Sequence, residues 1–153
     1  MAKQPKPSLK SNHQYSTFYV GDLFFAVEVL KVQEVLRYQE MTRVPLAPAE
    51  IEGLINLRGQ IVTAVDLRRM LKLDPRPAGR MPMNMVVRSD EGAVSLLVDE
   101  IGDVVEPPPA SYEPVPMTMR REQREVIEGV YKLEDRLLLV LNTERVLQGS
   151  LPQ

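Results

Sequence analysis

The sequence predicts a mainly β protein, folded as one small barrel or as two small barrels packed together. About nine short runs rich in Val, Ile and Leu alternate with turn residues, while helical patterns are few and brief. The two halves loosely echo each other in their order of hairpins and helical turns. The length of 153 residues fits one domain. The expected strands are residues 15–20, 23–29, 54–57, 61–65, 83–88, 93–98, 101–105, 126–133 and 136–141.

The N-terminal part begins with a polar segment, residues 1–13, which contains two prolines and three lysines and is expected to be a flexible tail. Gly21-Asp22 separates the first two apolar runs and predicts a β-hairpin. In residues 31–37 the apolar side chains have helical spacing, which predicts a short helix or helical turn. The β-branched valines of this segment also fit a strand.

Prolines and glycines divide the next segment. Pro48 suits the first turn of a brief helix over residues 49–52. Arg58-Gly59 separates two apolar runs and predicts a tight reversal, because glycine takes positive φ at little steric cost. Asp66 is expected to cap a helical turn over residues 67–71.

The C-terminal half contains two further hairpins, predicted from polar turns between neighbouring apolar runs. Residues 74–82 are a loop by composition, and the prolines at 107–109 end regular strand pairing. Oppositely charged side chains four residues apart predict a short surface helix over residues 120–125. Asn142 or Thr143 is expected to cap a last helix.

The sequence offers no workable set of catalytic side chains. Cysteine is absent, the single histidine, His13, lies in the expected tail, and no glycine-rich phosphate loop occurs. Ser95 and Ser111 have no evident base beside them. The paired carboxylates Asp99-Glu100 and Glu134-Asp135 fall at turns, where solvated side chains are the simpler interpretation. We therefore expect no enzyme activity, no catalytic or metal-binding residues and no cofactor.

Composition narrows the possible partners. Small barrels bind nucleic acids through interleaved aromatic and basic side chains, whereas here the net charge is −2 and aromatic residues make up 5%. The N-terminus lacks a signal-peptide pattern, and no apolar run approaches the ~20 residues of a membrane span. These features predict a cytoplasmic protein without membrane insertion that binds other proteins. The alternative is a small β-barrel that binds nucleic acid or a ligand.

Several longer motifs resemble the CheW family of chemotaxis adaptors. They occur in the family's order and are KVQEV at 31–35, the stretch from Pro45 to Gly59, VDLR at 65–68, VDEIGDVV at 98–105 and the segment at 127–147. The resemblance implies a mainly β fold of two packed five-stranded SH3-like β-barrels with a few short helices. It also implies one domain over residues 14–148, between tails at 1–13 and 149–153.

The resemblance further implies a function and its partners. A CheW-like protein is a non-enzymatic scaffold that couples chemoreceptors to the histidine kinase CheA, in the cytoplasm at receptor arrays beneath the inner membrane. The implied receptor-binding groove between the barrels takes the helical tip of the receptor and is formed by Val32, Glu34, Arg58, Ile101 and Val104. The implied contacts to the regulatory domain of CheA are Thr42, Val44 and Gly53. A second-barrel face, without assigned residues, is implied to join another kinase domain.

Two questions stay open at the level of the sequence. The family suggests that Glu34 and Arg58 form a salt bridge at the groove edge, whereas an ordinary exposed ion pair contributes only about 0–1 kcal/mol to stability. The three apolar residues assigned to the groove fit a core position equally well. The chain also departs from the common family pattern at Thr63, where proline is frequent.

Overall fold

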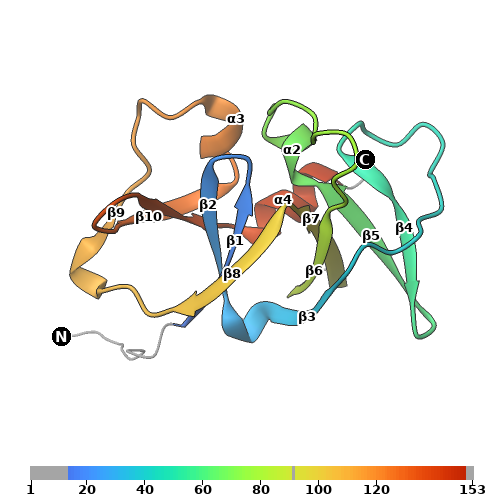
Figure 1. The fold of residues 1–153 in the computed structure, drawn as a ribbon, viewed down its shortest axis with the longest axis horizontal. Helices are drawn as coiled ribbons and strands as arrows, with labels where there is room; N and C mark the ends of the chain where they lie inside the picture. Colours follow the sequence, from blue (N-terminus) through green and yellow to red (C-terminus); the bar gives the residue numbers. More distant parts are fainter. Residues whose placement is uncertain (1–13, 91, 151–153) are drawn as a thin grey trace.

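Two β-sheets packed side by side make up the fold (Figure 1). The computed structural model describes residues 14–90 and 92–150. The expected N-terminal tail, with His13, and residues 151–153 lie outside the described residues. Figure 1 shows the six-stranded sheet on the left and the five-stranded sheet on the right.

The six-stranded sheet has the order β8-β1-β2-β11-β10-β9. Its neighbouring strands are antiparallel except β2 and β11, which run parallel. The strands are β1 (Tyr15–Val20), β2 (Leu23–Glu28), β8 (Glu100–Val105), β9 (Tyr112–Glu113), β10 (Ile127–Lys132) and β11 (Leu137–Leu141). The N-terminal hairpin and the C-terminal hairpin therefore share one sheet, as they lie next to each other through β2 and β11.

The five-stranded sheet has the order β3-β6-β7-β5-β4, again with one parallel pair, β5 and β7. The strands are β3 (Val32–Leu36), β4 (Ile51–Leu57), β5 (Gln60–Asp66), β6 (Met83–Ser89) and β7 (Gly92–Val98). The chain thus builds this sheet from its middle part and returns to the first sheet through β8.

The helices are short and lie between strands. They are the 3-10 turns η1 (Val29–Lys31) and η2 (Pro109–Ser111) and the α-helices α2 (Leu67–Met70), α3 (Arg121–Arg124) and α4 (Thr143–Ser150). The side chain of Asp66 accepts a 3.0 Å hydrogen bond from the Arg68 amide, which confirms the predicted cap. The Arg145 amide donates to the side chain of Asn142 at 3.1 Å, so Asn142 is the cap of α4.

The buried apolar side chains form three clusters. The largest lies between the two sheets and takes side chains from both, among them Phe18 and Phe25 from one sheet and Met85 and Leu96 from the other. Since side chains alternate along a strand, the opposite face of each sheet carries a cluster of its own. Phe24, next to Phe25, belongs to the cluster on the opposite face of the six-stranded sheet.

Each sheet curls around its own cluster without closing into a five-stranded barrel. On the six-stranded sheet, Val105 of the end strand β8 packs against the same cluster as Tyr131, although three strands separate β8 from β10. On the five-stranded sheet, Leu36 and Leu57 come from the two end strands and meet in one cluster. The mainly β class and the pairing of two barrel-like units are confirmed, and the strand counts are six and five.

One open alternative is decided, and one local prediction is wrong. Residues 32–36 form strand β3 and not a helix, which is the alternative that the valines allowed. Residues 49–50 form only a turn, and β4 begins at Ile51. The Asp66 amide donates to the Glu50 carbonyl at 2.7 Å, so this segment joins the sheet before a helix can begin.

A cluster of charged side chains ties both sheets together at one end. Asp99, between β7 and β8, accepts hydrogen bonds from Arg68 Nη2 at 2.7 Å, Arg76 Nε at 3.0 Å and the Gly21 amide at 2.6 Å. Burial alone would raise the pKa of Asp99, but these hydrogen bonds outweigh it and the pKa lies below its ordinary value. One carboxylate thus links the β1–β2 turn, α2 and the 74–82 loop.

We predict that Asp99→Asn lowers the free energy of unfolding at pH 7 by about 2–4 kcal/mol, because two half-buried arginines lose the nearest carboxylate charge. Because the pKa of Asp99 is lower in the folded protein than its unfolded value near 3.8, the carboxylate stabilises the fold at pH values above 3.8. This contribution is lost as the pH falls through the pKa of the folded protein. Urea unfolding from pH 7 to pH 3 should therefore show the two proteins converging below about pH 4.

The matched control is Asp135→Asn, which removes an exposed carboxylate 3.7 Å from Arg136 Nε and should cost less than about 1 kcal/mol. An equal loss in the two variants, or a difference between wild type and Asp99→Asn that does not shrink in acid, would contradict the role given to Asp99.

Candidate functional site

Arg58 is presented on the tight turn between β4 and β5. Arg58 and Gly59 both have positive φ, 53° and 89°, which is the pattern of the type I′ turns that suit β-hairpins. The Gly59 amide donates to the Asn56 side chain at 2.9 Å and fixes the turn further. The guanidinium is directed to Glu34 on β3, with which it forms a hydrogen-bonded ion pair.

The Glu34–Arg58 pair connects the two end strands of the five-stranded sheet. β3 and β4 are the first and last strands of this sheet and are not hydrogen-bonded to each other. The ion pair therefore spans the gap between these two end strands of the curled sheet. The Arg58 side chain is 70% exposed and that of Glu34 is 20% exposed. Such a pair adds only about 0–1 kcal/mol to stability, so its main effect is to fix the position of two charged groups at the surface.

The apolar residues assigned to the groove lie on the two strands that border the shared core. Ile101 is opposite Phe18 and Val104 is opposite Ser16, so both are on the face of β8 that points to the other sheet. Val32 and Ile101 are half-buried against the shared core. Val104 is 56% exposed and is therefore not a core residue. β8 and β3 are each an end strand, so these side chains line sheet edges.

Val35 belongs with these residues, and the sequence did not single it out. It is opposite Met85, a residue of the shared core, yet Val35 itself is 39% exposed. A shift of register between Val32 and Glu34 adds one residue to β3 and places Val32 and Val35 on the same face. The three-residue spacing that suggested a helix is therefore produced by a bulged strand.

The residues assigned to the kinase also come together, around the start of β4. Thr42 and Leu54 exchange two backbone hydrogen bonds of 2.9 and 2.8 Å, which adds a short bridge outside β4. A Cβ atom on Gly53 would lie 2.8 Å from the Thr42 carbonyl oxygen, so only glycine allows this approach. Val44 follows two residues later, half-buried, at the start of a turn.

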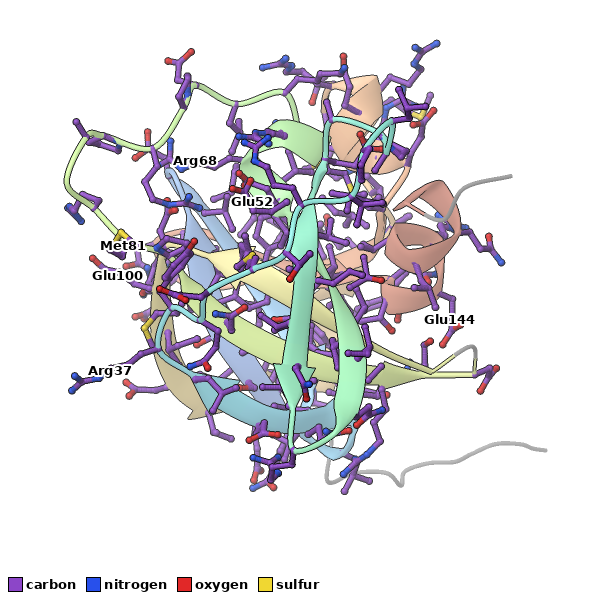
Figure 2. The ribbon with its side chains drawn as sticks, turned by 90° about the vertical axis from the view of Figure 1, so that its right-hand side faces the viewer. Arg37, Glu52, Arg68, Met81, Glu100 and Glu144 are labelled. Carbon is purple, nitrogen blue, oxygen red and sulfur yellow. The ribbon has the colours of Figure 1, made fainter. Side chains whose placement is uncertain are left out.

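The cavities of the described residues do not suggest a ligand site. One of about 280 Å³ lies beside the Asp99 cluster, where Arg68 and Arg76 are already paired with Asp99. Figure 2 shows Met81 and Glu100 side by side close to this place. Within residues 14–90 and 92–150, no group of His, Cys, Asp or Glu side chains could hold a metal ion. The same residues contain no helix that could span a membrane.

Two curled sheets around a shared core, with apolar side chains along their edges, define the class of fold. The chain matches the CheW-like domain over residues 14–150 and belongs to this family. It is 29% identical over 145 residues to the chemotaxis protein CheW of Bacillus subtilis, covering 95% of this chain and 93% of the relative.

Two further comparisons agree with this assignment. The chain is 27% identical over 135 residues to CheW of Helicobacter pylori, covering 88% of this chain and 81% of the relative. The crystal structure of the scaffolding protein TtCheW from Thermoanaerobacter tengcongensis superposes with a TM-score of 0.76 at 25% identity. That similarity covers 84% of this chain and 88% of TtCheW. The chain is thus a chemotaxis scaffold of the CheW family.

Proposed function

We propose that this chain couples chemoreceptors to the histidine kinase CheA, as a non-enzymatic cytoplasmic adaptor in receptor arrays beneath the inner membrane. The observation that carries the proposal is the set of exposed and half-buried apolar residues along β3 and β8, with the Glu34–Arg58 pair beside them. The family assignment supports the chemotaxis context.

The receptor-binding groove of this proposal runs between the edges of β3 and β8. Its apolar residues are Val32, Val35, Ile101 and Val104. A helix with one apolar stripe suits such a surface, because its side chains at i, i+3, i+4 and i+7 would cover both edges. The receptor tip is a helical hairpin in this family, and the Glu34–Arg58 pair would give its polar side chains a fixed partner.

The kinase-binding surface is separate from this groove. It contains the Thr42–Leu54 bridge, Gly53 and Val44, at the β4 end of the five-stranded sheet. Gly53 and the Thr42–Leu54 bridge lie near the start of β4, whereas the Arg58 turn follows the end of this strand, so one protein can hold both partners at once. This arrangement is what an adaptor requires.

We predict that the full chain captures full-length CheA from the same organism with micromolar affinity and fails to capture CheA that lacks its C-terminal regulatory domain. Pull-down followed by calorimetry measures both. Absence of CheA binding, together with salt-sensitive binding of RNA, would replace the adaptor by the nucleic-acid-binding alternative.

Arg58→Lys tests the ion pair. Lysine keeps the charge but cannot donate in the planar fork of the guanidinium, so we predict weaker binding of a receptor cytoplasmic fragment, by about three- to tenfold, with unfolding unchanged within about 0.5 kcal/mol. The control is Arg121→Lys, at the start of α3 in an exposed pair with Glu125, which should leave receptor binding unchanged. Wild-type affinity in a folded Arg58→Lys protein would contradict the role of the pair.

Val104→Asp tests the groove. Because Val104 is exposed, we predict that the variant folds normally and loses at least about tenfold in receptor affinity, as its charge would be desolvated under the bound helix. Met117→Asp, at a still more exposed apolar residue on the loop between β9 and α3, should bind the receptor fragment like wild type. Unfolding of Val104→Asp, or unchanged receptor binding, would remove Val104 from the groove.

A further inference from the structure

Leu46 is the most unusual apolar residue at the surface. Its side chain is fully exposed, and its backbone has a φ of 65°. Among the described residues, only Leu46, Arg58 and Lys72 are non-glycine residues with positive φ. Arg58 has a partner that explains its position, and Lys72 follows Leu71, the C-cap residue of α2, where this conformation is common. Leu46 has neither.

The conformation of Leu46 follows from the turn that contains it. The Ala47 amide donates to the Val44 carbonyl, which closes a four-residue turn with Pro45 in its second position. Proline in the second position and positive φ in the third are the pattern of a type II turn, whose third position favours glycine or asparagine. Leucine is disfavoured there because its Cβ crowds the following carbonyl oxygen.

The surrounding contacts hold this turn in place. Before it, Thr42 is fixed by its two backbone hydrogen bonds to Leu54. After it, Arg69 Nη1 of α2 donates to the Ala49 carbonyl at 3.1 Å and pairs with Glu52 at 3.1 Å. Figure 2 shows Glu52 between β4 and the α2 region. The loop is therefore anchored on both sides, and Leu46 is held out into solvent in one conformation.

We infer that Leu46 is the apolar anchor of the kinase-binding surface and inserts into an apolar pocket of the regulatory domain of CheA. The isolated molecule gains nothing from a strained, solvated leucine, whereas a partner gains a preorganised side chain. Leu46 lies two residues from Val44, on the loop that Thr42 and Gly53 anchor, so it continues this surface. The inference rests on the proposed function, since it names the contact that CheA would make.

Leu46→Asn separates strain from binding. Asparagine tolerates positive φ, so the thermal unfolding midpoint should rise by about 2–4 °C. The Kd for full-length CheA should rise about ten- to hundredfold, because the complex loses a buried leucine. Lys72→Asn is the matched control: it relieves the same backbone conformation elsewhere, so the midpoint rises and the Kd stays unchanged. Leu46→Met keeps the apolar bulk and should keep wild-type affinity.

The outcomes distinguish the two claims. If wild type binds CheA and Leu46→Asn binds equally well, the anchor is wrong and the adaptor function stands. A midpoint that falls in Leu46→Asn would contradict the strain on which the inference rests. If wild type itself does not bind CheA, the proposed function fails and the anchor fails with it.

Discussion

The apolar core between the two sheets is the feature on which the other surfaces depend. Phe18 and Phe25 from one sheet meet Met85 and Leu96 from the other, so neither sheet can move without exposing large apolar area. This packing sets where the end strands β3 and β8 lie, because both carry residues against the same core. The exposed members of these edges are available to a partner because no further strand pairs beyond them in the described sheets.

Backbone geometry explains why local sequence patterns predicted the hairpins but not every element. The hairpin turns at Gly21 and Gly59 take positive φ, which glycine signals directly. The segment over residues 31–37 has apolar residues three apart because of a register shift in β3, and this shift depends on pairing with β6. A pattern confined to seven residues cannot contain that information. The strand counts of six and five likewise depend on pairing between segments far apart in sequence.

In the candidate site, too, some features could be predicted from the sequence and others depend on the three-dimensional structure. Glu34 and Arg58 are 24 residues apart, and the family resemblance paired them before the structure placed them in contact. The need for glycine at position 53 is explained only by the Thr42 carbonyl beside it, which the sequence does not show. Val35 is identified by its strand register and its exposure, and Leu46 by its exposure and its backbone angle. None of these properties can be read from the sequence. The proposed binding residues therefore lie on strand edges and in a loop.

The proposed coupling depends on a receptor helix that binds across the edges of β3 and β8. Methyl-resolved NMR of the full chain, titrated with a receptor cytoplasmic fragment, tests this contact. We expect the largest shifts at the methyl groups of Val32, Val35, Ile101 and Val104, with little change at Val115 and Met117. Shifts confined to Val115 and Met117, with the four edge residues unchanged, would contradict it.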